Sequence, residues 1–175
     1  MEKWNAYTRD GKLKDIILVM DEPVPEGLYH LVCEVLVRHI DGSYLCMKRA
    51  MCKSVYPGVY EASAGGSALF GEDKYQCIKR ELREETGINC DVFQEVGRCV
   101  QEDSHSIFYS FVCTVDCDKE AVILQEGETE DFRWLTEEEF VRYVNSDDGI
   151  DRQKERYYNY FISKGYLEEG HDHNF

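Results

Sequence analysis

Short runs of apolar residues, separated by turn-forming residues, fill most of the chain up to about residue 135. Within these runs, Val, Ile, Leu and aromatic residues recur at the two-residue spacing of β-strands. An Asp10-Gly11 pair between two such runs is a strong signal for an N-terminal β-hairpin. Strands are predicted over residues 5–20 (two strands), 28–39, 44–50, 59–66, 90–100, 106–116 and 131–135.

Helical spacing replaces this pattern at three places. The clearest helix is predicted for residues 74–86, where Ile78 and Leu82 form an apolar face and Gly87 supplies a stop signal. A second helix is predicted at the T-x-x-E capping box that begins at Thr136. The strand-rich body, the central helix and the C-terminal helices predict an α+β fold.

The third predicted helix covers about residues 150–164. Its aromatic side chains are expected to pack on the body of the domain or on a second subunit; they are Tyr157, Tyr158, Tyr160 and Phe161. The tail that follows contains His171 and His173 and is predicted to be mobile, with adventitious metal binding at most.

Length and composition favour one globular domain over residues 1–175. We expect a hairpin and connector at 1–27, a core at 28–145, and a helix and tail at 146–175. The chain is 43% hydrophobic and 31% charged, and no apolar run approaches the roughly 20 residues that span a bilayer. The N-terminus lacks the apolar segment of a secretory signal, so a cytoplasmic protein is expected.

The charge balance restricts the partners. The formal net charge is -15, and such a surface repels nucleic acid and anionic membranes, which are bound largely by Lys and Arg. A small anionic substrate would need divalent cations or a local basic patch. The eight cysteines include no C-x-x-C pair, so reduced, partly buried thiols are expected instead of disulfides or a zinc site.

The central helix carries an unusual set of carboxylates. Glu81, Glu84 and Glu85 stand at i, i+3 and i+4, so they share one helix face although like charges at this spacing destabilise a helix. Carboxylate oxygens are the ligands that Mg²⁺ prefers, and Mg²⁺ bridges them to substrate phosphates. From the spacing alone, a solvated charged face and a metal site both remain open.

A longer pattern separates these two alternatives. Residues 66–88 match G-x5-E-x7-R-E-U-x-E-E-x-G-U, with U apolar, at every position. Seven positions require a specific residue, so a chance match is on the order of 10⁻⁸ per starting position. The segment resembles the Nudix box, and the strand order around it is compatible with the Nudix α/β/α sandwich and its mixed central sheet.

The resemblance implies a hydrolase of phosphoanhydride bonds. It implies that Glu84 and Glu85 are metal ligands, that Glu81 is a ligand or the general base, and that the Gly65 carbonyl is a further ligand of Mg²⁺ or Mn²⁺. Arg80 would orient the catalytic glutamates. The remaining matched positions would support the site: Glu72, Gly66 and Gly87.

Many members of this family supply another acid from a loop after the box. The segment 124–135 offers four acidic residues, of which Glu130 is our first choice and Glu128 our second. An acidic solvated loop is the alternative interpretation of this cluster. The resemblance implies a nucleoside diphosphate derivative as substrate, such as a nucleotide sugar, a dinucleotide or a nucleoside triphosphate.

Residues 26–66 also resemble the branch that contains isopentenyl-diphosphate isomerases, an alternative activity. The isomerase has a catalytic Cys followed two residues later by a His ligand, and Gly65 and Ser67 occupy these positions here. His30 matches another His ligand of the isomerase, but its later Glu ligands would fall near Ser104 and Ser106. These departures favour hydrolysis, with His30 as a structural strand residue.

A catalytically silent binding module is the third alternative, and the intact box argues against it. Several aromatic residues could stack on a base or a ribose, although strand aromatics more often belong to the core; they are Trp4, Tyr7, Tyr56, Tyr60 and Phe108. By analogy with Nudix proteins, we expect a homodimer with the N-terminal hairpin at its interface. No motif selects one nucleoside diphosphate derivative over another.

Overall fold

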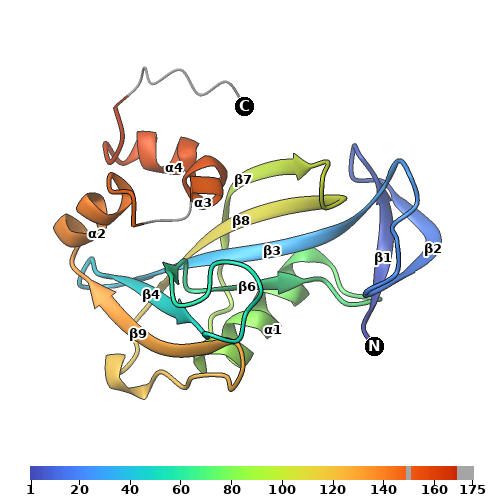
Figure 1. Ribbon diagram of the computed structural model, residues 1–175. Helices are drawn as coiled ribbons and strands as arrows, with labels where there is room; N and C mark the ends of the chain where they lie inside the picture. The colour runs from blue at the N-terminus through green and yellow to red at the C-terminus, as the bar shows by residue number, and fades with distance from the viewer. Residues whose placement is uncertain (149–150, 169–175) are drawn as a thin grey trace.

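Strand β3 is the axis of a mixed sheet that carries helices on both of its faces (Figure 1). The structure is a computed structural model that describes residues 1–148 and 151–168. The strands are β1 (Lys3–Thr8), β2 (Leu13–Val19), β3 (Leu28–His39), β4 (Tyr44–Arg49), β5 (Tyr60–Glu61), β6 (Ala64–Ser67), β7 (Gln94–Gln101), β8 (Ser106–Val115) and β9 (Thr129–Leu135). The helices are α1 (Lys74–Thr86), the 3₁₀-helix η1 (Lys119–Ala121), α2 (Glu137–Val144), α3 (Asp151–Arg156) and α4 (Tyr158–Ser163).

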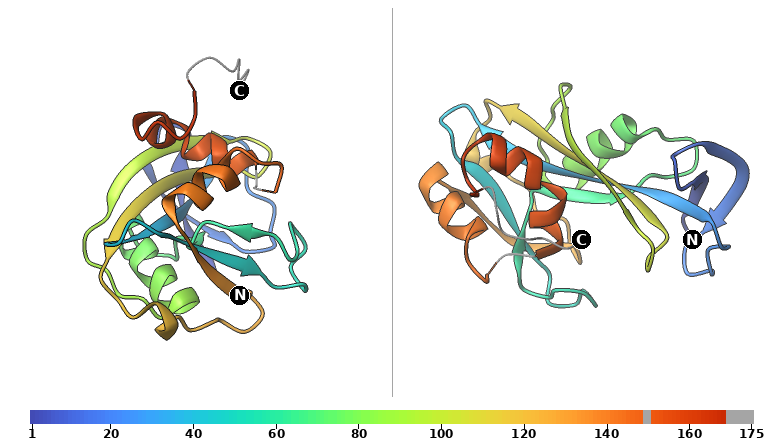
Figure 2. Two further views of the ribbon diagram at one scale, coloured as in Figure 1. Left: turned by 90° about the vertical axis from the view of Figure 1, so that its left-hand side faces the viewer. Right: turned by 90° about the horizontal axis from the view of Figure 1, so that it is seen from above.

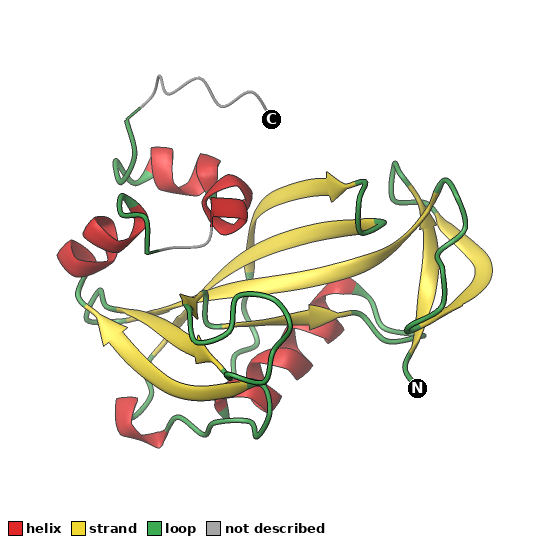
Figure 3. Ribbon diagram, viewed as in Figure 1, coloured by secondary structure: helices red, strands yellow, loops and turns green. Residues whose placement is uncertain are grey.

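Strand β3 pairs with four other strands along its length. It runs parallel to β8 over ten residue pairs and antiparallel to β6, β1 and β4. The hairpin β1–β2 extends one end of the sheet, and β9 and β5 flank β4 at the other end (Figure 3). The predicted α+β fold with a mixed sheet and an N-terminal hairpin is confirmed.

Alternate residues of β3 face two separate cores. Leu31, Cys33 and Val35 pack with α1 in the first core, and Leu36 packs with α2 and α4 in the second. The views in Figure 2 show the C-terminal helices on the opposite side of the sheet from α1. This two-residue alternation is the pattern that predicted the strand.

Local signals fix the two ends of α1. Asp73 caps its N-terminus by accepting hydrogen bonds from the backbone N–H groups of Tyr75 and Gln76, both at 2.8 Å. The Gln76 side chain accepts in return from the Asp73 N–H at 2.9 Å. At the other end, Gly87 has φ 72° and donates its N–H to the Arg83 carbonyl at 2.9 Å. The predicted bounds of this helix are confirmed.

Three predicted elements differ from the structure. The single strand predicted over 59–66 is two short strands, because the chain leaves β4 after Glu61 and joins β3 at Ala64. The helix predicted over about 150–164 is two helices, because Tyr157 adopts φ -99° and ψ 7° between them. The strand predicted from residue 90 starts at Gln94.

Three of the four C-terminal aromatic residues pack on the body as expected, and Tyr158 is only half-buried. Tyr157, Tyr160 and Phe161 are buried in the second core, and the Tyr157 hydroxyl donates to the Phe111 carbonyl at 3.1 Å. The predicted tail with His171 and His173 lies outside the described residues. All eight cysteines are unpaired. Within residues 1–148 and 151–168, no helix is long and apolar enough to cross a bilayer.

Candidate active site

The end of β6, the loop that follows it and helix α1 bring the predicted site residues together. The backbone of Gly65 and Gly66 lies beside the carboxylate-bearing face of α1. Ile78 and Leu82, both fully buried, fix the opposite face of the helix in the first core. The apolar face predicted from the sequence therefore determines where the glutamates point.

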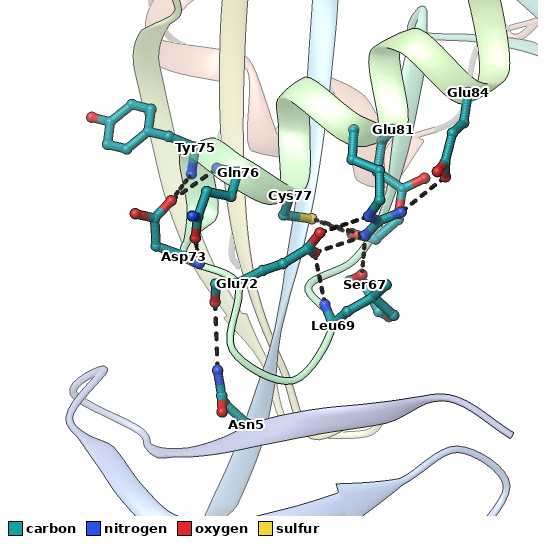
Figure 4. A network of polar contacts seen from close by, with 12 residues as sticks. Asn5, Ser67, Leu69, Glu72, Asp73, Tyr75, Gln76, Cys77, Glu81 and Glu84 are labelled. Carbon is teal, nitrogen blue, oxygen red and sulfur yellow. Dashed lines mark hydrogen bonds and ion pairs between the residues drawn. The ribbon is translucent and has the colours of Figure 1, made fainter.

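Figure 4 shows the polar contacts around Glu72, Glu81 and Glu84, and the Arg80 guanidinium joins these three carboxylates. Its Nε and Nη2 donate to the two carboxylate oxygens of Glu72 at 2.8 and 2.9 Å. Its Nη1 donates to Glu81 at 2.8 Å and to Glu84 at 3.1 Å, and Nη2 also donates to the Ser67 carbonyl at 3.1 Å. The hydrogen bonds to Glu72 first, and then the charge of Glu81, raise the pKa of Arg80. Arg80 therefore stays charged and fixes three carboxylates at once.

Glu72 anchors this network to the loop. Burial on its own would raise the pKa of Glu72, but the hydrogen bonds from Arg80 and from the Leu69 N–H lower it overall. The Glu72 carbonyl also accepts from the Asn5 side chain at 3.4 Å, so the loop contacts the N-terminal hairpin. These contacts tie Glu72 to Arg80 and to the loop, and its supporting role in the site stays a prediction.

A side chain at Gly66 would displace the Glu81 carboxylate. A Cβ atom there would lie 2.3 Å from the Glu81 carboxylate oxygen, well inside van der Waals contact. The Glu81 side chain is only 12% exposed. Burial raises the pKa of Glu81, and the Glu84 charge adds to this against the lowering effect of Arg80. A carboxylate with a raised pKa is suited to accept a proton.

Glu85 points away from Arg80 and toward β6. Its carboxylate accepts from the Gly65 N–H at 3.3 Å. Burial, followed by the charges of Glu81 and Glu61, raises the pKa of Glu85 well above its ordinary value. Glu61 was not anticipated from the sequence. Its position on β5 becomes visible only once that strand is placed next to β4.

Residues 1–148 and 151–168 contain no group of three or more His, Cys, Asp or Glu side chains already arranged to hold a metal ion. The reason is visible in the contacts, because Glu81 and Glu84 face Arg80 whereas Glu85 faces Gly65. The donor set still fits a hard divalent cation, since these oxygens share one helix face next to the Gly65 backbone. A cation would also relieve the repulsion that raises the pKa of Glu85.

The two acids predicted outside the box have different environments. Glu130 is bound by the Lys48 ammonium at 2.7 Å and by the Met51 N–H at 3.3 Å. Glu128 is bound by Lys53, and its charge contributes to the raised pKa of Glu85. These contacts favour Glu128 over our first choice, Glu130, and the role of either acid stays a prediction.

His30 and the candidate stacking residues occupy defined environments. His30 is buried against Trp4 with ring centroids 4.2 Å apart, and its Nε2 contacts the Ser106 hydroxyl at 2.9 Å. This is the environment of a structural strand residue. The Tyr60 ring centroid lies 3.4 Å from the Arg133 guanidinium carbon. The guanidinium of Arg156, from α3, lies over the Phe108 ring.

A family model described as the NUDIX domain matches residues 28–163. The chain belongs to the Nudix family. A Nudix hydrolase of Listeria monocytogenes (lmo0368) is 30% identical over 150 residues, which are 86% of this chain and 89% of the relative. The Nudix hydrolase YfcD of Escherichia coli K12 is 32% identical over 116 residues, or 65% of this chain and 63% of the relative. The Nudix chain is thus a hydrolase of the pyrophosphate-bond class.

Solved structures share the fold at low sequence identity. The DR0079 protein of Deinococcus radiodurans aligns with a TM-score of 0.66 and 18% identity over 83% of this chain and 90% of its own. The NUDIX domain of Shewanella oneidensis NrtR, complexed with ADP ribose, aligns with a TM-score of 0.54 and 14% identity over 65% of this chain and 77% of its own. The predicted Nudix sandwich is confirmed, whereas the resemblance to the isomerase branch stays a prediction.

Proposed function

We propose that this Nudix protein is a Mg²⁺-dependent hydrolase that cleaves the diphosphate linkage of a nucleoside diphosphate derivative. The observation that carries the proposal is the arrangement of three carboxylates around the Gly65–Gly66 backbone. Two of them, Glu81 and Glu84, are fixed by Arg80, and the third, Glu85, is half-buried and accepts from the Gly65 N–H. The substrate classes that remain are nucleotide sugars, dinucleotides and nucleoside triphosphates.

The residues that would hold Mg²⁺ or Mn²⁺ are Glu84, Glu85 and the Gly65 carbonyl, and Glu81 would serve as a further ligand or as the general base. When bound, the metal neutralises diphosphate charge and acidifies an attacking water. As the base, Glu81 would accept a proton from the attacking water while the new P–O bond forms and the bridging P–O bond breaks, with the bridging oxygen leaving on the second phosphate-containing product. Arg80 keeps Glu81 and Glu84 in position during this step. Either Glu128 or Glu130 adds an acid from outside the box.

Charge, free thiols and exposed apolar residues support a partner class, a compartment and an oligomeric state for the enzyme. With a net charge of -15, the partner is a small phosphorylated molecule rather than nucleic acid or an anionic membrane. Eight unpaired thiols suit a reducing cytoplasm. The exposed Leu13, Ile16 and Ile17 on the edge strand β2 support a homodimer through the hairpin, which light scattering in solution would detect.

A substrate panel tests this proposal. Nucleotide sugars, dinucleoside polyphosphates and nucleoside triphosphates are incubated with Mg²⁺, Mn²⁺ or a chelator, and nucleoside monophosphates, phosphate and pyrophosphate are quantified. We expect monophosphate release from at least one class, with loss of turnover in the chelator. Turnover that persists in the chelator would contradict the metal requirement. Binding without turnover would favour the silent module, and double-bond migration in isopentenyl diphosphate would favour the isomerase.

A further inference from the structure

A pocket of about 190 Å³ reaches Gly65, whose backbone N–H donates to the Glu85 carboxylate. The lining of the pocket also includes Glu61, whose charge contributes to the raised pKa of Glu85. The opposite wall comes from Glu34 on β3, Phe108 on β8 and Arg156 at the end of α3. We call this cavity the Arg156 pocket. It joins β6, where the Nudix box begins, to a segment more than 60 residues further along the chain.

The strand register explains why these residues meet. Gly65 on β6 pairs with Glu34 on β3, Glu34 pairs with Ser110 on β8, and Ser110 pairs with Gly97 on β7. One row across the sheet therefore leads from the catalytic backbone to the strand on which α3 rests. Neighbouring strands are about 4.8 Å apart, so Glu34 is the first side chain beyond Gly65 along this row.

Two ion pairs line the pocket. Arg156 Nη1 donates to Glu34 Oε2 at 2.8 Å, and the Ser110 hydroxyl donates to Glu34 Oε1 at 2.9 Å. Arg49 Nη1 donates to Glu61 Oε1 at 2.5 Å. The pocket thus contains two cations and two carboxylates with no net charge. A phosphate placed there would approach both carboxylates, which disfavours an anionic occupant.

The walls of the Arg156 pocket contain hydrogen-bonding groups and the flat stack of Arg156 on Phe108. The Arg156 guanidinium lies 3.6 Å from the centroid of the Phe108 ring. Its Nε is buried and has no hydrogen-bond partner, although its Nη1 is paired. The Nε atom is not exposed to the pocket, so a ligand would contact the other polar atoms of the lining. Together with the carboxylate acceptors, these groups match a neutral ligand rich in hydroxyl groups.

The size of the pocket suits a single ring. Its volume is below the roughly 300 Å³ at which typical small-molecule sites begin, so a nucleoside with its base and ribose does not fit as a whole. We propose that the Arg156 pocket binds the terminal sugar ring of a nucleoside diphosphate sugar, and that Arg156 and Glu34 determine this specificity. The inference rests on the proposed hydrolase function and narrows its substrate class.

The test compares substrates that share adenosine diphosphate and differ beyond it. KM and kcat are measured for ADP-ribose, ADP-glucose and ATP with wild type, Arg156→Ala and Glu34→Gln. We expect the wild type to prefer the ADP-sugars over ATP. In both variants this preference should fall by about tenfold or more, through KM and not kcat, because a hydrogen bond to a charged group is lost. Arg152→Ala on the exposed side of α3 is the matched control and should keep the wild-type preference.

Two further measurements keep the outcome decisive. Arg156→Lys preserves the charge beside Glu34 but lacks the planar fork, so it should fold as the wild type does and still lose most of the preference. Calorimetric binding of ADP-ribose without metal gives a readout that does not need turnover. Equal effects on all three substrates, or unchanged binding in Arg156→Lys, would overturn the inference. A wild type that binds ADP-ribose through Arg156 but hydrolyses nothing would instead refute the proposed function.

Discussion

Among single residues, Arg80 has the largest share of the polar contacts at the site. One guanidinium donates to Glu72, Glu81 and Glu84, and its side chain is only 18% exposed. A planar, permanently charged fork can make these contacts together, and a lysine ammonium cannot. The carboxylates thus have their positions fixed before any metal or substrate arrives, which reduces the cost of assembling the site.

The first prediction concerns Arg80 itself. Arg80→Ala should lower both kcat/KM and the apparent affinity for Mg²⁺ by about 10- to 100-fold, because the carboxylates lose the group that orients them. Arg80→Lys should recover only part of this loss. Arg83→Ala, at an exposed position of the same helix, is the control. Metal titration of initial rates gives both quantities, and an Arg80→Ala enzyme equal to the control would contradict the role.

The sequence predicts the residues of the box but not the residues that surround them in space, because only the box residues are close together in the sequence. Positions 66–88 are local in sequence, so helix spacing and turn signals place them. The partner of Glu34, in contrast, is 122 residues away, and only the strand register brings it close. A charged residue inside the apolar run 28–39 was the available signal, since buried carboxylates are almost always paired.

At the scale of elements, α3 depends on contacts more than on its own helical propensity. It spans only six residues, and isolated helices of this length do not persist in water. Gln153 accepts from the Ala62 N–H at 2.9 Å, and Arg156 pairs with Glu34. The break at Tyr157 follows from burial of that ring, so the sequence predicts a helical region here but not its division.

Gly97 provides a test of how α3 is seated. A Cβ atom at this position would lie 2.3 Å from the Arg156 carbonyl, so the helix must shift when a side chain is added. Gly97→Ala should lower the free energy of unfolding by about 1–3 kcal/mol and raise KM for the substrate. Urea unfolding and steady-state kinetics measure the two effects. Gln94→Ala, at an exposed position of the same strand, should change neither. Wild-type stability in Gly97→Ala would show that α3 does not depend on this contact.

On the scale of the whole molecule, one sheet separates two cores that differ in how far the sequence predicts them. The first core is built by the alternating strands and α1, and most of it is predictable from periodicity. The second core joins β3 and β4 to the C-terminal aromatics through contacts such as Tyr44 with Tyr166, which are remote in sequence. The order of the strands in the sheet is also a tertiary property, and the periodicity of the sequence does not specify it.

Burial of His30 makes the stability of the whole fold dependent on pH. Burial first, and the nearby His105 to a smaller extent, lowers the pKa of His30 from 6.5 to about 4. Its Nδ1 has no hydrogen-bond partner, and its Nε2 contacts Ser106. Between about pH 6.5 and pH 4, the unfolded chain therefore binds a proton that the folded protein does not, and stability falls as the pH falls through this window.

We expect this residue to account for about 3 kcal/mol of acid destabilisation. His30→Gln should show a correspondingly shallower loss of unfolding free energy between near-neutral and acidic pH. Urea denaturation at several pH values measures both slopes. Parallel curves for wild type and variant would mean that His30 titrates alike in the folded and unfolded states. Above about pH 6.5 the difference should no longer change with pH.

The most direct test of the central claim is the turnover number of the Glu84→Gln/Glu85→Gln double variant with Mg²⁺ on the best substrate of the panel. The substitutions keep side-chain size and relieve the burial of a carboxylate at position 85, so the fold should be retained. Glu138→Gln, on an exposed face of α2, is the control. We predict that kcat of the double variant falls by about 100-fold or more. Unchanged turnover in a folded double variant would contradict catalysis by the box carboxylates.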